Sequence, residues 1–218
     1  MPTLNDAEAR VLGVLIEKSL TTPDSYPLSI NAALNACNQK SNRDPVTSYV
    51  EAEVVVALQG LLPKGLAGRV MAAGSRVEKF RHTANAALGL DDGRLAVLAE
   101  LLLRGPQSPG ELRARVHRMS PTASLEELSS RLDGLIAAGI VERVPPSPGS
   151  RAERYAQLLA PGLHPVAVAP AAAPRPSPSP AVPAAAGRAL LEERVEALER
   201  QVAELSARFD DLLARLGG

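Results

Sequence analysis

The sequence is poor in aromatic residues and cysteine, and it has no excess of either charge. Of its 218 residues only 2% are aromatic, and none is tryptophan. Cys37 is the only cysteine, which excludes an internal disulfide. Lysine and arginine together number 24, as do aspartate and glutamate, so the chain as a whole has no positive field that would attract nucleic acid.

The signatures of enzymes and membrane proteins are also missing. There is no HExxH, no pair of CxxC motifs, no phosphate-binding P-loop and no GxGxxG. The three histidines are far apart in the sequence, so we expect no catalytic residue, no cofactor and no metal. The chain has neither a basic-then-apolar leader nor an apolar run of membrane length, which favours a cytoplasmic protein.

What is present is a series of helix-start signals. Asn5 and Glu8 form a capping box for a first helix, and Ser29 caps a second. Ser48 and Glu51 are spaced as the start of a third. Apolar residues follow each signal at helical spacing, as in Leu12, Leu15 and Ile16 of the first helix. A polar loop separates the second helix from the third.

After the third helix the period changes to that of strands. Residues 66–72 and 77–83 are typical of two short strands, and glycine lies in the loop between them. Three helices followed by a β-hairpin predict a winged helix-turn-helix domain. We expect Cys37, at helical spacing from Ile30 and Leu34, to be a core residue of this domain.

A shorter copy of the same pattern follows. Residues 90–105, LDDGRLAVLAELLLRG, are similar to the start of the first unit, LNDAEARVLGVLIEKS. Ser108 and Ser124 begin two further helix-start boxes, S-P-G-E and S-L-E-E. Residues 141–144 and 154–158 would form the second hairpin. The sequence therefore predicts a mainly α fold with small β-hairpins, built as tandem winged-helix domains.

The first unit also resembles a known family. Residues 17–46, EKSLTTPDSYPLSINAALNACNQKSNRDPV, and residues 75–82, SRVEKFRH, are similar to the YceH family of bacterial proteins. The resemblance is specific over residues 4–89 and looser over residues 90–160. It implies a winged-helix fold. It implies no catalytic residues, because the family has no assigned function.

Composition divides the chain into four segments. Two winged-helix domains are predicted at residues 1–89 and 90–160. Residues 161–187 are rich in alanine and proline, which indicates a disordered linker or, alternatively, a proline-motif ligand. Residues 188–218 carry an apolar seam with alternating four- and three-residue steps, typical of a coiled coil.

The seam predicts a homodimer through a C-terminal helix. Val or Phe occupies three a positions and Leu occupies the d positions, a pattern that favours two parallel strands. The alternative is a single helix packed on the rest of the chain. The predicted oligomerisation residues are Leu191, Val195, Leu198, Val202, Leu205, Phe209, Leu212 and Leu216.

Charge distribution leaves two functions open. Basic residues gather in the first hairpin and in the loop before the third helix, where they would contact DNA phosphates. These candidates are Lys40, Arg43, Arg69, Arg76, Lys79 and Arg81. The third helices of both units begin with acidic residues, which would repel phosphates. We predict a DNA-binding, transcription-regulatory protein of unknown target, and the alternative is a protein–protein adaptor that does not read DNA.

Overall fold

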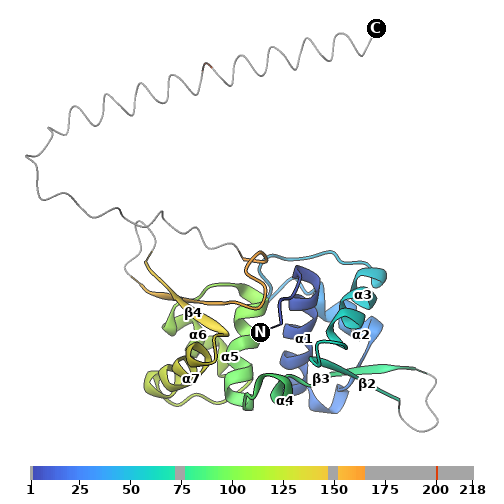
Figure 1. The fold of residues 1–218 in the computed structure, drawn as a ribbon, viewed down its shortest axis with the longest axis horizontal. Helices are drawn as coiled ribbons and strands as arrows, with labels where there is room; N and C mark the ends of the chain where they lie inside the picture. Colours follow the sequence, from blue (N-terminus) through green and yellow to red (C-terminus); the bar gives the residue numbers. More distant parts are fainter. Residues whose placement is uncertain (1, 72–76, 147–151, 165–199, 201–218) are drawn as a thin grey trace, which may run out of the picture. The chain divides into compact units, whose positions relative to one another are not determined.

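Two similar halves make up the described part of the chain, which comprises residues 2–71, 77–146, 152–164 and 200 of a computed structural model. Both halves belong to one compact unit, residues 1–169. Each half places three helices before an antiparallel hairpin (Figure 1). This confirms the prediction of a mainly helical fold with small antiparallel sheets.

The first half contains a three-stranded sheet. Its elements are α1 (Asp6–Thr21), the 3₁₀ turn η1 (Pro23–Ser25), β1 (Leu28–Ser29), α2 (Ile30–Cys37), α3 (Glu51–Leu61), β2 (Ala67–Val70) and β3 (Lys79–His82). The strand order is β1-β3-β2, and Phe80 of β3 lies opposite Leu28 on one side and Arg69 on the other. The strand β1 has only two residues, too few to give a sequence signal.

The second half repeats this order with a two-stranded sheet. After the short connecting helix α4 (Ala84–Leu88), its elements are α5 (Asp92–Arg104), α6 (Pro109–Val116), α7 (Leu125–Ala137), β4 (Val141–Val144) and β5 (Arg154–Gln157). The predicted strand 141–144 is confirmed, and the predicted strand 154–158 ends one residue earlier. Helix α4, which is followed by Gly89 in the left-handed region, was not predicted.

Most predicted helix caps are present, with one correction. The side chains of Asn5, Ser29, Ser108 and Ser124 each accept a hydrogen bond from the backbone amide three residues later. Ser48, however, does not cap α3. Val50 occupies the cap position, and its amide donates to the Glu53 carboxylate at 2.8 Å. The loop remains extended through Val50, so the helix begins two residues later than predicted.

Helices α1 and α5 form the centre of the unit, and they lie side by side in Figure 1. Ten consecutive residues of α1, Glu8–Glu17, are buried, as are nine consecutive residues of α5, Leu95–Leu103. An amphipathic surface helix buries only one face, whereas a helix buried on all sides lies in a core. The two halves therefore share one hydrophobic core along these helices. A glycine, Gly13, sits where a Cβ atom would meet the side chains of Leu102 and Leu103 at 3.0–3.2 Å.

The compact unit extends past its predicted end at residue 160. Leu163 is buried, and the His164 ring lies against Gly105. The His164 Nε2 atom is 2.5 Å from the Asp44 carbonyl oxygen. Residues 161–164 thus belong to the folded unit, because Leu163 contributes to the core. The rest of the predicted linker and all eight predicted seam residues lie outside the described residues.

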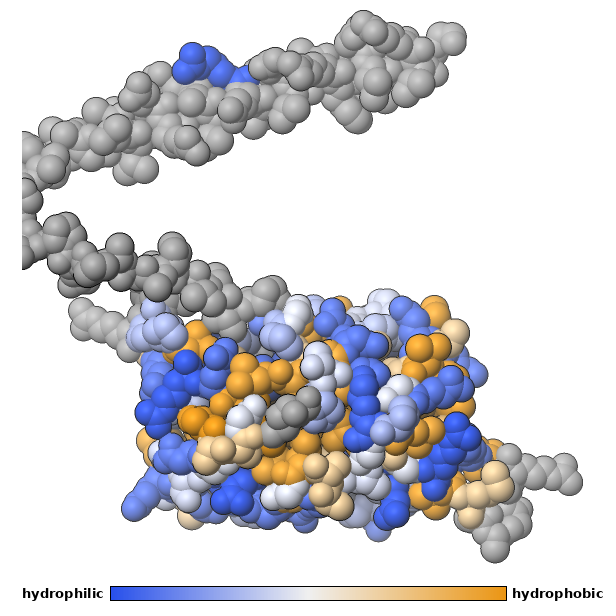
Figure 2. Space-filling view, in the orientation of Figure 1, coloured by the Kyte–Doolittle hydropathy of each residue, from blue (hydrophilic) through white to orange (hydrophobic). Residues whose placement is uncertain are grey.

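Outside the core, hydrophobic residues interrupt the hydrophilic surface around the N-terminus (Figure 2). Within the described ranges, no helix is both long and apolar enough to span a membrane.

A long polar side chain crosses a glycine of the third helix in each half. In the first half Glu8 crosses Gly60, where an added Cβ atom would lie 2.1 Å from Glu8 Oε1. Glu8 is buried, and its Oε2 atom accepts from the Asn5 amide and from Lys64 Nζ at 2.5 Å. In the second half Arg94 crosses Gly134 in the equivalent position, with Arg94 Nε at 2.5 Å from the added Cβ.

We expect Gly60→Ala to destabilise the protein although alanine favours helix. The added methyl would displace Glu8 from the Asn5 amide and from Lys64, and each lost hydrogen bond costs about 1 kcal/mol. The helix-propensity gain is only about 1 kcal/mol. Gly110→Ala in α6 is the matched control, because its Cβ would meet no atom within 4 Å. Urea unfolding should show a loss of stability for Gly60→Ala and no loss for Gly110→Ala. Equal effects of the two substitutions would contradict the packing argument.

Candidate functional site

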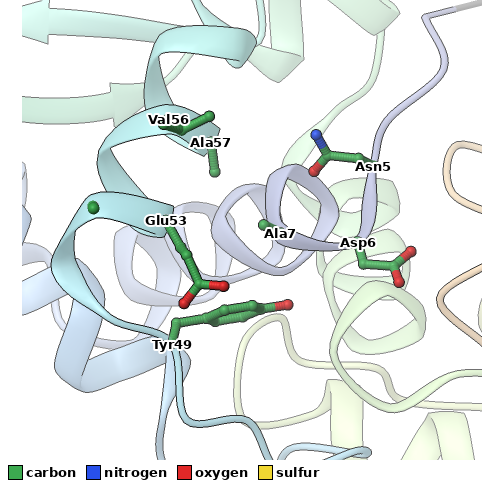
Figure 3. A pocket seen from close by; sticks show the side chains of 8 residues that line it. Asn5, Asp6, Ala7, Tyr49, Glu53, Val56 and Ala57 are labelled. Atoms are coloured by element: carbon green, nitrogen blue, oxygen red, sulfur yellow. The ribbon is translucent and has the colours of Figure 1, made fainter.

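A groove of about 700 Å³ lies between α3 and the first turn of α1. We name it the α1–α3 groove; it is lined by Asn5, Asp6, Ala7, Tyr49, Ala52, Glu53, Val56 and Ala57. In Figure 3 the Tyr49 ring lies below α1 at one end, while Val56 and Ala57 project from α3 at the other. Glu53 extends from α3 toward Tyr49. The side chains of small residues line much of the groove, which keeps it open.

The loop before α3 fixes the position of Tyr49. The Asn38 side chain accepts from the Tyr49 amide at 2.9 Å and donates to the Tyr49 carbonyl oxygen at 2.8 Å. Thr47 Oγ1 donates to the Cys37 carbonyl oxygen at 3.2 Å. These bonds tie the loop to the end of α2. Burial raises the pKa of Tyr49, against an opposing effect of the nearby Arg10 charge, so its hydroxyl stays protonated at neutral pH.

Exposed apolar side chains lie on α3 and on the loop that precedes it. Val56 of α3 is 63% exposed, Val50 is 59% exposed and Val46 is 55% exposed. Scattered exposed valines are ordinary, but these three belong to one loop and the helix that follows it. The sequence contained a signal for this surface, because three consecutive valines, Val54–Val56, cannot all face the core of one helix. Only Val54 is fully buried.

Strand β3 of the first hairpin presents two of the predicted DNA-contacting residues. Lys79 and Arg81 are exposed and alternate along β3 with the buried Phe80. The strand is anchored at its end, where Ser19 Oγ lies 2.9 Å from His82 Nε2 and the Tyr26 hydroxyl accepts from the His82 amide at 2.5 Å. Lys79 and Arg81 therefore point away from the body on a fixed strand.

The other predicted contacts are less uniform. Lys40 is exposed in the loop after α2. Arg69 is exposed but lies 3.5 Å from Glu78, which neutralises part of its charge. Arg76 lies outside the described residues. Arg69, Lys79 and Arg81 thus lie on one hairpin. Arg69 is paired with Phe80, however, and shares its face of the sheet, opposite to the face of Lys79 and Arg81. Lys40 belongs to a separate loop.

Arg43 must be removed from the predicted surface set. Its side chain is fully buried, and Arg43 Nη2 lies 2.6 Å from the Glu17 carboxylate. The guanidinium also donates to the Ala36 and Asn42 carbonyl oxygens. A guanidinium enclosed in this way cannot reach a phosphate. The sequence showed a basic residue in a polar loop, but nothing local indicated that a buried carboxylate two helices away would bind it.

Glu17 and Arg43 belong to a charged cluster between the two halves. Arg118, which follows α6, places Nη2 at 2.7 Å from Glu17 and 3.3 Å from Glu100 of α5. Arg104 Nε lies 3.0 Å from Glu100. Burial by itself would raise the pKa of Glu17, but the hydrogen bonds and charges of Arg43 and Arg118 outweigh it and lower that pKa. The carboxylate is therefore charged at neutral pH.

In the second half, several arginines on and near α6 and α7 are engaged within the protein. Arg115 Nη1 donates to the Gln107 side chain at 2.6 Å, and Arg118 bonds to Glu17. On α7, Arg131 lies 2.6 Å from Glu127 and also donates to Thr122 and to the Pro121 carbonyl oxygen. These arginines stabilise helix contacts and present little free charge.

The histidines and the cysteine have structural environments. His82 and His164 bond to Ser19 and Asp44, and burial lowers the pKa of both imidazoles, so they are neutral at pH 7. His117 Nδ1 accepts from the Thr122 amide at 3.3 Å. Cys37 is buried as predicted, and burial raises the pKa of its thiol to about 12. A thiol of that pKa is a poor nucleophile.

Comparison with known proteins places both halves in one family. The family described as "Protein of unknown function, DUF480" matches residues 4–159. A UPF0502 protein of Geotalea daltonii is 56% identical over 160 residues, covering 72% of this chain and 73% of the relative. A UPF0502 protein of Mesorhizobium japonicum is 46% identical over 214 residues, 97% of each chain. One from Klebsiella pneumoniae is 42% identical over 222 residues, 96% of each chain.

The family match extends across both helix–hairpin halves, from residue 4 to residue 159. The similarity inferred from the first unit is therefore confirmed, and the second half is included with it. The relatives are described only by a family label, with no activity, ligand or partner. The chain belongs to the DUF480, or UPF0502, family of YceH-like bacterial proteins of unknown function.

Proposed function

We propose that this protein is a tandem winged-helix module that binds another protein rather than reading DNA bases. The order of three helices and a hairpin in each half supports the winged-helix assignment. In such domains the third helix is the element that contacts the ligand. The composition of α3 and α7 therefore decides between the two functions.

The observation that carries the proposal is the lack of free cations on both third helices. Helix α3, EAEVVVALQGL, contains no lysine or arginine and begins with Glu51 and Glu53. Base edges are read chiefly by arginine, lysine, asparagine and glutamine near the helix N-terminus. In α3 only Gln59, near the C-terminal end, has such a side chain. In α7 the single arginine, Arg131, is bonded to Glu127.

A second candidate function is contact with the DNA backbone through the first hairpin. Lys79 and Arg81 favour it, because both are exposed and the described residues provide no ion-pair partner for either. Phosphate contacts of this kind give affinity without sequence preference. This interaction would need no contribution from α3.

Retention on random-sequence duplex DNA across a salt series distinguishes the two functions. Under the adaptor proposal, wild type and the Arg76→Ala/Lys79→Ala/Arg81→Ala variant should both fail to bind at physiological salt. Backbone binding would instead appear as salt-dependent retention that the triple variant weakens, since each lost phosphate contact lowers the salt slope by about 1. Arg113→Ala, an exposed cation outside the hairpin, is the control and should change neither outcome.

Self-association through the C-terminal seam is part of the same proposal. Each seam leucine that enters a helix–helix interface buries apolar surface worth roughly 1.5–3 kcal/mol. Leu198→Asp with Leu205→Asp would place two charges per chain in that interface. Light scattering should give a dimer mass for the full chain and a monomer mass for the double variant and for residues 1–164. The same mass for all three would remove the seam as the dimerisation element.

We also propose that the protein is not an enzyme. The hydrogen bonds of all three histidines and the raised pKa of Cys37 support this, because these are the side chains from which a nucleophile or general base would most often come.

A further inference from the structure

We propose that the α1–α3 groove binds an amphipathic helix of a partner protein, and that this helix carries lysine or arginine beside its apolar face. The inference rests on the adaptor function proposed above and names the chemistry of the partner. Three features of the groove support it: its apolar lining, its helical walls and the sign of its charge.

The lining suits a helix that buries one apolar stripe. Ala7, Ala52 and Ala57 are small, so the backbone of a bound helix can approach closely. In Figure 3 Val56 and the Tyr49 ring stand on either side of Ala57 and Ala7, and they would contact the larger side chains of the bound helix. Covering the exposed face of Val56 would remove apolar surface from water, which is the main favourable term in association.

The walls exclude an extended peptide that pairs as a strand. Both walls, α1 and α3, are helices, so the groove offers no extended strand edge with which a peptide could form a ladder of hydrogen bonds. A helix satisfies its own backbone and needs only side-chain contacts. Recognition by residues at i, i+3, i+4 and i+7 follows from this geometry.

The charge of the groove defines the partner further. Asp6 and Glu53 line it, Glu51 begins the same helix, and no lysine or arginine is among its lining residues. One oxygen of Glu53 accepts from the Val50 amide, and the carboxylate remains exposed and negative. Cations at the edge of a partner helix would complement this field, and acidic residues there would be repelled.

The same argument excludes the chain's own C-terminal segment as the occupant. Residues 188–218 have an apolar seam, but they carry seven acidic residues and five arginines. A segment of net negative charge does not complement an acidic groove. The partner helix must therefore come from another protein with basic residues flanking its apolar stripe.

The test is selection of helical peptides from a displayed random library against the full-length protein. Binding of synthetic copies is then measured by fluorescence anisotropy. We expect enriched peptides with apolar residues at i, i+3, i+4 and i+7 and with flanking lysine or arginine. Val56→Asp, at a mostly exposed position, should weaken binding at least tenfold without unfolding the protein. Leu125→Asp, at an exposed position on α7, is the matched control and should leave binding unchanged.

Four results would overturn the proposal. If the peptides bind the Val56→Asp variant as tightly as wild type, the binding site lies outside the groove. If they bind the Leu125→Asp variant more weakly than wild type, the binding site lies on α7. Either result leaves the adaptor function intact. Enrichment of acidic peptides would reject the charge argument. No enrichment, together with salt-dependent retention on DNA, would reject both the groove and the adaptor function.

Discussion

Glu17→Ala is expected to lower the free energy of unfolding by about 3–5 kcal/mol, because it would leave buried guanidinium charge without a partner. Arg43 is fully buried, and its main ionic partner is the Glu17 carboxylate at 2.6 Å. Arg118 would also lose its closer partner and retain only Glu100. Chemical denaturation in urea, followed by circular dichroism, measures the loss.

The matched control is Asp133→Ala. Asp133 and Arg143 form an ion pair of similar length, 3.0 Å, but both side chains are more than half exposed. Exposed pairs contribute little, so this variant should unfold close to wild type. If the two variants lost equal stability, the effect of Glu17 would not come from burial of its arginine partner.

The dependence on pH follows from the same residue. The pKa of Glu17 is lower in the folded protein than its ordinary value of 4.5. The contribution of Glu17 to the free energy of unfolding is therefore complete above pH 4.5 and is lost as pH falls through the pKa of the folded state. The stability difference between wild type and Glu17→Gln should be constant at neutral pH and shrink below pH 4.5. A stability difference between the two proteins that grows as the pH falls would contradict the lowered pKa of Glu17.

A fragment of residues 1–89 is expected not to fold by itself, whereas residues 1–164 should unfold in one cooperative transition. Helix α1 is buried over ten consecutive residues, and α5 covers one side of it. Without α5 that side would face water, and the first half has a small core. Loss of the second half would also remove Arg118 from the buried Glu17.

Circular dichroism and urea titration of both fragments measure this. A cooperative transition for residues 1–89 with native helix content would show that the halves are independent domains that happen to be in contact. The boundary predicted at residue 89 would then mark a real unit of stability as well as a repeat.

The sequence was sufficient to predict the helix starts and strands that depend on residues close together in the chain. Ser108 and Ser124 mark helix starts because a hydroxyl that accepts from an amide three residues later acts within one turn. Residues 141–144 were identified as a strand because they occupy the place of the first hairpin in the repeated pattern. The mainly helical class and the family followed from such local patterns and from their repetition.

Features that depend on distant contacts were missed. Arg43 is buried because its guanidinium binds the Glu17 carboxylate of α1. Helix α3 starts only at Glu51 because the Asn38 side chain holds Tyr49 in an extended loop. Neither partner is recognisable from its neighbours in the sequence. The groove was missed for the same reason, since 29 residues, Thr22 to Val50, separate α1 from α3 along the chain, and the two helices meet only in the fold.

The two glycines crossed by long side chains show what the repeat has kept. Glu8 over Gly60 and Arg94 over Gly134 occupy equivalent places but carry opposite charges. Both halves therefore have a glycine at this position of the third helix, which leaves room for a long side chain from another helix. The charge of that side chain is negative in the first half and positive in the second. For anyone redesigning this scaffold, the glycine is the fixed constraint and the residue above it is the variable one. Exchanging Glu8 for glutamine should be tolerated better than any side chain added at Gly60.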